Sequence, residues 1–458
     1  MDPDTLTLDV VPAKVAAEGD PWAGMDDDPQ SLDPLLGWYD RDMDAGLMDA
    51  PWPPVSPKQP NEPPRVAPEP RPPGRCHVIP VLLAVAGWIA GWWLWGRPRT
   101  VRDLAAEAPT PSGSLAVVIP ARNEAEVLPH LLADLAADPD PLRRVIVVDD
   151  GSDDETATIA RSYAGVEVLA APALPAGWTG KSWACDVGAR AACDGPVGEP
   201  RQLVFLDADV RLAPGALRMV AAAAERHGGL FSVQPYHRMR RAYEHLSLLP
   251  NLVSIMSTGT GRRRRPPTGA FGPLLACSPT DYHAIGGHAS VRSLVAEDVG
   301  LGLRFREHDL PVTIAMGGQD VRFRMYPRGV GQLVEGWTKN MASGATAVSP
   351  TWALLTALWI TAAASAFLSL PVVPGNREVG GVIGLALYLA FVVQLGALGR
   401  RAGSFGVVTA IAYPLPLAAF MALFARSAWR TRISRRVTWR GRSITFGDPV
   451  GGGAETLP

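Results

Sequence analysis

The residues Leu115-Ala-Val-Val-Ile-Pro-Ala-Arg-Asn-Glu124 run from a short apolar stretch directly into a polar turn. The same change recurs in Arg144-Val-Ile-Val-Val-Asp-Asp-Gly-Ser152 and in Leu203-Val-Phe-Leu-Asp-Ala-Asp209. Amphipathic patterns at residues 124–136 and 154–163 lie between these stretches. Alternation of short apolar strands with helices predicts an α/β domain with a mostly parallel sheet covered on both faces. In such sheets ligands bind at the carboxyl ends of the strands, where these polar residues lie.

Charge divides the chain of 458 residues unevenly. Residues 1–75 carry 15 Asp and Glu against six Lys and Arg and are rich in proline, whereas the remainder carries 30 against 37. We expect residues 1–75 to be a disordered acidic tail, because such a composition buries too little apolar surface to offset the entropy of ordering. The basic excess of the remainder suits a membrane surface or a phosphate-bearing substrate, and is too diffuse to indicate nucleic acid.

Four apolar segments predict membrane helices. Residues 78–95 form an uncharged run of 18 residues, so we expect a transmembrane helix over 76–97. Arg97, Arg99 and Arg102 follow at once, which places the next domain, residues 110–347, in the cytoplasm by the positive-inside rule. Segments 351–370, 380–399 and 404–425 predict further membrane helices over 350–426, and hence a multi-pass protein of the plasma membrane.

The basic tail conflicts with that count of segments. Three full crossings after a cytoplasmic domain would put residues 427–458 outside the cell, but their arginines indicate a cytoplasmic tail. We therefore expect one segment to be interfacial or re-entrant. Pro414 and Pro416 point to the last of the three, because proline interrupts a helix that spans a bilayer.

Three acidic motifs are candidates for chemistry. Asp150 ends the second strand, where a carboxylate can bind a nucleoside; the alternative is a turn that caps the next helix. Asp207 and Asp209 follow the third strand and together can reach a divalent cation; the alternative is a solvated loop. Glu297 and Asp298 begin a helical stretch, where a carboxylate can act as a general base; the alternative is a favourable first-turn charge.

Lys181 lies in a glycine-rich loop, Gly177-Trp-Thr-Gly-Lys181, that opens a helix predicted over residues 182–192. Backbone N–H groups and one cation at a helix start can bind a phosphate. The loop lacks the spacing of a Walker A motif, so it does not indicate an ordinary ATPase site.

Along the chain the acidic motifs come in the order Asp150, then Asp207 with Asp209, then Glu297 with Asp298, and Gly286-Gly-His288 lies between the last two of them. This order resembles the family 2 inverting glycosyltransferases with a GT-A fold. The resemblance covers about residues 114–340. It implies a nucleotide-sugar donor bound by Pro120, Glu124, Asp150, Lys181 and Asp207. It also implies Mg²⁺ or Mn²⁺ held by Asp209, and Asp298 as general base with Glu297 beside it.

Further motifs are similar to those of carotenoid-acid glycosyltransferases and hopanoid-associated glycosyltransferases. They are Gly177-Trp-Thr-Gly-Lys181, Gln234-Pro-Tyr-His237, Gly286-Gly-His288 and Trp439-Arg-Gly-Arg442. This likeness implies a lipid or isoprenoid acceptor that approaches from the membrane. UDP-glucose is the donor that the family suggests.

Processive polysaccharide synthases of this family carry Gln-x-x-Arg-Trp after the base, whereas this chain has Gln332-Leu-Val-Glu-Gly-Trp337. The missing arginine favours a single transfer over chain synthesis, and Trp337 is then a candidate platform for the acceptor or a packing residue. A polysaccharide synthase and a non-catalytic nucleotide-binding scaffold stay as alternatives. The four retained aspartates, Asp150, Asp207, Asp209 and Asp298, count against the scaffold.

Overall fold

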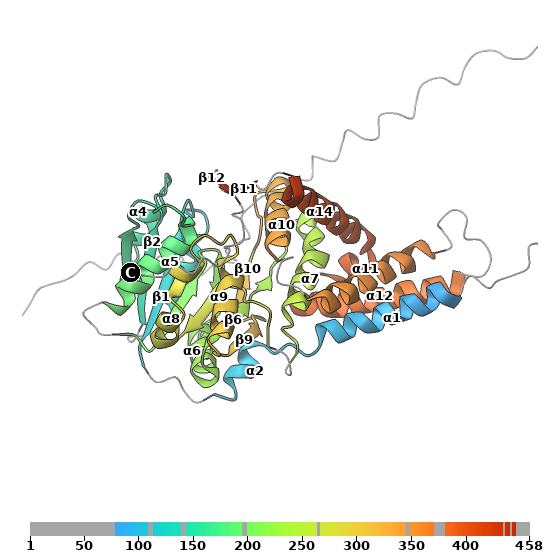
Figure 1. The fold of residues 1–458 in the computed structure, drawn as a ribbon, viewed down its shortest axis with the longest axis horizontal. Helices are drawn as coiled ribbons and strands as arrows, with labels where there is room; N and C mark the ends of the chain where they lie inside the picture. The colour runs from blue at the N-terminus through green and yellow to red at the C-terminus, as the bar shows by residue number, and fades with distance from the viewer. Residues whose placement is uncertain are drawn as a thin grey trace, which may run out of the picture. The chain divides into compact units, whose positions relative to one another are not determined.

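The computed structural model describes residues 78–108, 113–138, 143–194, 199–262, 266–344, 349–370, 381–433, 436–439 and 442–445 (Figure 1). The prediction of a disordered acidic tail over residues 1–75 lies outside the described residues. The same is true of most of the tail beyond residue 433.

A seven-stranded sheet forms the centre of the α/β part, in the order β3-β2-β1-β4-β8-β6-β9. All neighbours are parallel except β8, which pairs antiparallel with both β4 and β6. The strands are β1 (Leu115–Ala121), β2 (Arg143–Asp149), β3 (Val166–Ala170), β4 (Gln202–Leu206), β6 (Leu230–Gln234), β8 (Leu274–Cys277) and β9 (Val312–Met316). The prediction of an α/β fold with a mostly parallel sheet is confirmed, and the three strands that the sequence indicated are β1, β2 and β4.

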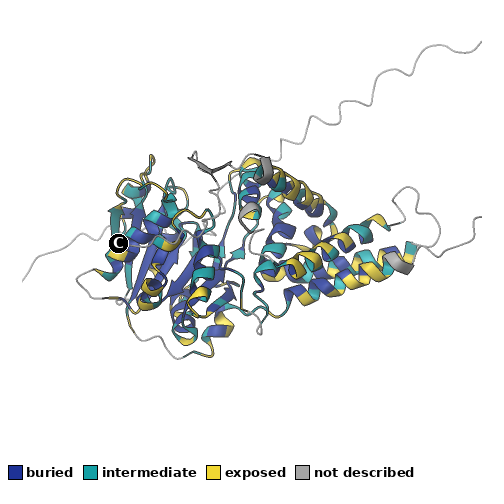
Figure 2. Cartoon of the chain, in the orientation of Figure 1, coloured by how far each residue is buried: buried dark blue, intermediate teal, exposed yellow. Residues whose placement is uncertain are grey.

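Helices cover both faces of this sheet, because its strands are apolar on both sides. In β1, Val117 and Ile119 face one buried cluster, while Ala116 and Val118 face the other. The first cluster includes α2 (Val101–Ala105), α3 (Leu128–Ala137), α4 (Thr156–Arg161) and α6 (Ala216–His227). The second includes α5 (Gly180–Cys193), α8 (Pro279–Ala284), η2 (Gly287–Val291) and α9 (Glu297–Glu307). Figure 2 shows the resulting buried layer as dark blue strands. Successive side chains of a strand point to opposite faces, so an all-apolar strand must be covered twice.

A smaller sheet and three helices lie beyond the central sheet. The order of the small sheet is β5-β10-β7, formed by β5 (Val210–Leu212), β10 (Val321–Phe323) and β7 (Tyr236–His237). The helices are η1 (Ala242–Ser247), α7 (Leu248–Thr258) and α10 (Val330–Gly344). Because β5 follows Asp207 and Asp209 directly, the small sheet fixes the loop that carries both carboxylates.

Three apolar helices form a bundle. They are α1 (Val78–Trp95), α11 (Pro350–Leu368) and α12 (Gly381–Ala402). By length and composition, two of the described helices, α11 and α12, could cross a membrane, and α1 is a shorter apolar helix over Val81–Trp95. Gly87 and Gly91 let α1 approach α11 closely, since a Cβ on Gly87 would lie 2.2 Å from the Cβ of Ala362. Glycines four residues apart serve helix pairs in membranes in this way.

One buried polar residue joins all three helices of the bundle. Gln394 of α12 accepts a hydrogen bond from the Trp359 indole at 2.9 Å and donates one to the Trp88 carbonyl at 2.8 Å. In a low-dielectric surrounding an amide bonded through both its oxygen and its nitrogen specifies how the helices pack.

The third C-terminal segment differs from the continuous apolar stretch expected over residues 404–425. It forms two helices, α13 (Val407–Ile411) and α14 (Pro414–Ile433), and the C-terminal part of α14 carries Arg426, Arg430 and Arg432. Pro414 lacks an N–H and so starts a new helix instead of continuing the first one. A short hairpin, β11 (Arg436–Trp439) with β12 (Arg442–Thr445), follows.

Candidate active site

The loops after β1 and β2 hold each other through local hydrogen bonds. The Asn123 N–H donates to Ser152 Oγ at 3.0 Å, and the Asp153 N–H donates to Asn123 Oδ1 at 2.8 Å. Asn123 has a φ of 54°, a left-handed conformation that asparagine tolerates better than most residues. The Glu124 N–H donates to Thr156 Oγ1 at 2.8 Å, at the start of α4. These loops are therefore built before any ligand arrives.

Three predicted donor-binding residues lie at this edge of the sheet. Pro120 and Glu124 stand at the end of β1, and Asp150 follows β2, whose last residue pairs with Ala121. Arg122 bridges the two loops, since its Nη1 donates to the Asp150 carbonyl at 2.6 Å and lies 3.7 Å from the Asp150 carboxylate. Pro120, Glu124 and Asp150 are partly exposed, as a nucleoside site at the strand ends requires.

A cluster of charges forms where α5, β4 and α9 meet. Lys181 Nζ lies 2.8 Å from Asp207 Oδ1 and 3.0 Å from Glu297 Oε1. Lys181 begins α5, Asp207 follows β4, and Glu297 begins α9, so the fold joins residues that are up to 116 positions apart in the sequence. Glu297 is only 7% exposed, and its pairing with Lys181 offsets the cost of its burial.

Backbone N–H groups hold Asp298, the residue after Glu297. Its Oδ2 accepts from Gly272 N–H at 2.7 Å, and its Oδ1 accepts from Val299 N–H at 2.9 Å. A side chain at position 272 would displace Asp298, because a Cβ there would lie 2.9 Å from Asp298 Oδ2. The sequence motifs did not indicate Gly272, since its contribution is a backbone group whose partner lies 26 residues away.

The electrostatics of the cluster favour a base at Asp298. Burial and then the charge of Glu297 raise the pKa of Asp298 to about 6, against the opposing effects of Lys181 and the two N–H groups. Burial raises the pKa of Glu297, but the charges of Lys181 and Lys339 together with hydrogen bonds to the carboxylate outweigh it, so the net shift is downward. Two adjacent carboxylates thus differ in basicity: Glu297 stays ionised beside its cation, and Asp298 is the better proton acceptor near neutral pH.

Lys339 of α10 is a second cation of the cluster, and no motif pointed to it. Burial lowers its pKa, while the charges of Glu297, Asp298 and Asp207 oppose that shift. Lys339 is thus coupled electrostatically to the same carboxylates that Lys181 faces. Lys339 lies two residues after Trp337, beyond the stretch Gln332–Trp337 that the sequence comparison considered.

His288 lies beneath the cluster and stays neutral. Its Nδ1 is 2.9 Å from the Tyr282 hydroxyl, and its ring packs edge-on against Phe205 with centroids 4.7 Å apart. Burial lowers the pKa of His288 to about 3, partly opposed by Glu297. The Gly286-Gly-His288 motif therefore supports the floor of the site rather than supplying a proton.

Asp209 lies near Tyr326, whose pKa is raised by burial and then by the Asp209 charge. The Tyr326 hydroxyl accepts from Asn340 Nδ2 at 3.1 Å. Among the described residues, no group of three or more His, Cys, Asp or Glu side chains is arranged around one metal position. Asp209 still fits Mg²⁺ or Mn²⁺, since such ions at phosphate sites commonly take one or two protein carboxylates and complete their shell with phosphates and water.

Trp337 lies in a separate packed cluster. It is 5% exposed, its indole N–H donates to Ser247 Oγ at 3.0 Å, and its ring meets Tyr326 at a centroid distance of 6.0 Å. Leu333 and Leu423 complete this cluster. Such burial favours the packing role of Trp337 over the acceptor platform, because little of its ring is free for a ligand.

The family model for glycosyl transferase family 2 matches residues 116–286. The chain is 35% identical over 342 residues to 4,4'-diaponeurosporenoate glycosyltransferase of Staphylococcus aureus (strain USA300). The aligned region covers 73% of this chain and 88% of that relative. This chain belongs to glycosyl transferase family 2. The resemblance that the motifs indicated is thereby confirmed, and the central sheet is that of the GT-A fold.

Two solved structures are similar to this chain at lower identity. A mannosyltransferase from Pyrobaculum calidifontis, in complex with GDP-Man and Mn²⁺, is 16% identical with a TM-score of 0.43, and the match covers 78% of this chain and 99% of that one. Glucosyl-3-phosphoglycerate synthase from Mycobacterium tuberculosis, in complex with Mn²⁺, UDP and glucosyl-3-phosphoglycerate, is 18% identical with a TM-score of 0.35. That match covers 56% of this chain and 86% of the other.

Proposed function

We propose that this family 2 glycosyltransferase is membrane-bound and inverting. It moves one sugar from a nucleotide-sugar donor, with UDP-glucose the first candidate, to a lipid-like acceptor. The observation that carries the proposal is Asp298, a partly buried carboxylate held by Gly272 N–H, whose pKa is raised to about 6 beside the pair of Lys181 and Glu297. The similarity to a relative whose name gives 4,4'-diaponeurosporenoate supports a carotenoid acid, or a hopanoid, as acceptor.

The donor would bind along the edge formed by the carboxyl ends of β1, β2 and β4. Pro120, Glu124 and Asp150 line the nucleoside end, and Lys181 and Asp207 face the diphosphate. Asp209 would hold Mg²⁺ or Mn²⁺, which neutralises charge on the departing diphosphate. When the donor arrives, Lys181 can exchange Asp207 for a phosphate oxygen without leaving Glu297.

The transfer itself is a single in-line displacement. An acceptor oxygen forms a bond to the anomeric carbon while the bond from that carbon to the diphosphate oxygen breaks, so the configuration inverts. A hydroxyl acceptor would give its proton to Asp298, and the nucleoside diphosphate leaves with the bonding electron pair. Glu297 keeps Lys181 in place and makes Asp298 more basic, so it acts as a positioning residue.

The membrane topology is also part of this proposal. We place the catalytic part, residues 110–347, on the cytoplasmic side of the plasma membrane, with α1, α11 and α12 in the bilayer. The arginines after α1 and the arginine-rich end of the chain support this side.

The test is nucleotide release by the full-length protein in detergent, with UDP-glucose, Mn²⁺ and a membrane lipid extract. We expect UDP release that needs both lipid and metal and that Asp298→Asn abolishes. Asp309→Asn is the matched control, because Asp309 is exposed and lies at a left-handed position that asparagine tolerates. Activity that is unchanged in Asp298→Asn would refute the assignment of the base, and silence with every donor would favour the scaffold.

A further inference from the structure

Helices α13 and α14 are tied to the catalytic part near both of their ends. In α13, Thr409 Oγ1 lies 2.7 Å from His245 Nδ1 of η1. In α14, the buried Ser427 hydroxyl donates to the Thr338 carbonyl of α10 at 3.1 Å. A helix pair held in this way cannot cross a bilayer without taking η1 and α10 with it.

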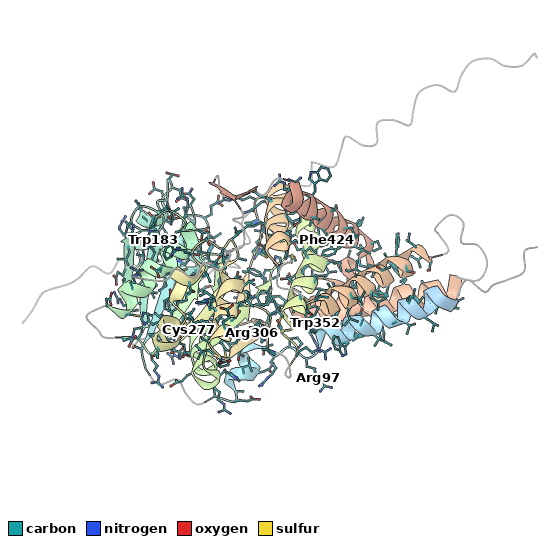
Figure 3. All side chains as sticks on the ribbon, in the orientation of Figure 1. Arg97, Trp183, Cys277, Arg306, Trp352 and Phe424 are labelled. Atoms are coloured by element: carbon teal, nitrogen blue, oxygen red, sulfur yellow. The ribbon has the colours of Figure 1, made fainter. Side chains whose placement is uncertain are left out.

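The opposite side of the same two helices is apolar and exposed. We call it the outer face: Val407, Val408, Ile411, Leu415, Met421, Phe424 and Trp429. Val408 is 79% exposed, Leu415 67% and Trp429 68%. Figure 2 shows exposed positions along α14, and Figure 3 labels Phe424 among them. A surface helix of a water-soluble protein would carry polar residues here, so this face indicates an apolar surrounding.

The charges at the end of α14 match a bilayer surface. The sequence has no Asp or Glu from residue 379 to residue 447, and it has nine arginines there. Arg426 and Arg430 follow the apolar part of the outer face within α14, and Trp429 stands between them. Arginines beside an apolar helix face bind anionic headgroups, and tryptophan prefers the boundary between headgroups and acyl chains.

The number of membrane helices agrees with this placement. If α11 and α12 both cross the bilayer, the chain returns after α12 to the side from which α11 left. That side is the one on which the catalytic part lies, which is where the tethers to His245 and Thr338 require α13 and α14 to be. The conflict between three apolar segments and a basic cytoplasmic tail therefore disappears when the last segment does not cross.

We infer that α13 and α14 form an interfacial platform whose outer face enters the headgroup region of the leaflet on the catalytic side. The platform contacts α10, and α10 in turn links it to the catalytic centre. Thr338 of α10 accepts from Ser427, Leu423 packs with Trp337, and Lys339 is coupled electrostatically to Glu297. Contact with the leaflet thus sets the height of the site above the bilayer. The role of that height rests on the proposed function, in which the acceptor is a membrane lipid.

The direct test is the depth of Phe424. A fluorophore on Phe424→Cys, in full-length protein with Cys76 and Cys193 changed to Ser, is reconstituted in vesicles that contain phosphatidylglycerol and lipids brominated at a shallow or a deep acyl position. We expect quenching that is stronger with shallow bromines, and none for the same label on Arg161→Cys of α4. Stronger quenching by deep bromines would mean that α14 spans, and no quenching would mean that the face is not in lipid; either overturns the inference.

A functional test uses the double variant Met421→Asp/Phe424→Asp. The control is Leu174→Asp, because Leu174 is an exposed leucine outside the bundle. Transfer to acceptors of the lipid extract in nanodiscs should fall about tenfold in the double variant, because charges on the outer face oppose its insertion. Transfer in detergent micelles should be unchanged, which also shows that the variant is folded. Equal activity in nanodiscs would overturn the inference. A parent protein without any transfer would instead contradict the proposed function and leave the quenching result interpretable.

Discussion

The donor loops and the catalytic cluster occupy the same edge of one sheet, but they are stabilised differently. In the donor loops, hydrogen bonds join Asn123, Ser152 and Thr156 to groups about thirty residues away, and hydroxyl and carboxylate side chains accept from backbone N–H groups. In the cluster, Lys181, Asp207 and Glu297 neutralise each other across three elements. The hydrogen bonds of the loops are thus formed without a ligand. The ion pairs of the cluster, in contrast, would be rearranged by a charged ligand. Changes to the cluster should therefore alter rates and their pH dependence, and changes to the loops should alter stability.

The largest effect is expected for Asp298→Asn, which keeps the shape but removes the base. We expect kcat to fall by about 10²–10⁴-fold, the usual contribution of general-base catalysis, with a donor KM close to that of the parent. Steady-state product formation measures both constants. A variant that keeps more than half of its kcat would contradict the assignment of Asp298 as general base.

Lys181→Met should have the next largest effect, because it leaves both Asp207 and Glu297 without their common cation. We expect kcat/KM for the donor to fall by about 10²-fold, roughly 2.7 kcal/mol of lost transition-state stabilisation. Lys339→Met is the comparison; its smaller expected loss, about tenfold, reflects the absence of a diphosphate role for it in the proposed site. Reversal of this order would assign the diphosphate to α10.

Glu297→Gln should move the pH profile rather than abolish activity. The charge of Glu297 raises the pKa of Asp298, which is about 6. Activity in the parent is therefore lost as the pH falls through about 6, where Asp298 takes up a proton. Without the Glu297 charge that acidic limb should lie at lower pH, whereas in Lys181→Met it should lie at higher pH. Profiles of kcat/KM measure both shifts, and shifts of the same sign would contradict this electrostatic arrangement.

Ser152→Ala, in the donor loops, should give the smallest effect. It removes the acceptor of Asn123 N–H and costs about 1–2 kcal/mol of unfolding free energy, with the pH profile unchanged. Chemical denaturation of the detergent-solubilised protein measures the loss. A changed pH profile in this variant would show that the two regions are coupled.

The sequence indicated β1, β2 and β4 correctly because each is a continuous apolar run that ends in carboxylates or turn residues. It also indicated Glu297 at the start of α9, since acidic residues favour the first turn of a helix. It did not indicate Gly272, whose role is a backbone N–H and a missing Cβ. Nor did it indicate Lys339, because a lone lysine in an amphipathic helix has no local signature.

The apolar segments likewise show what the sequence indicates and what depends on tertiary packing. Hydropathy alone made residues 404–425 look like another membrane helix, although Pro414 and Pro416 made this segment the one expected not to cross. The structure breaks it at Pro414 and ties its two helices to η1 and α10. Local composition measures how apolar a helix is. Which neighbour covers each of its faces depends on the packing.

The sequence by itself determined the family, the sheet and the strand-end carboxylates, because these follow from short-range patterns of apolar and acidic residues. Only the tertiary structure decided which charges meet. Lys181, Asp207, Glu297 and Lys339 come from four separate elements, and their pairing follows from how helices pack on the sheet. Burial then sets the pKa of each group, and burial is a property of the whole fold rather than of any segment.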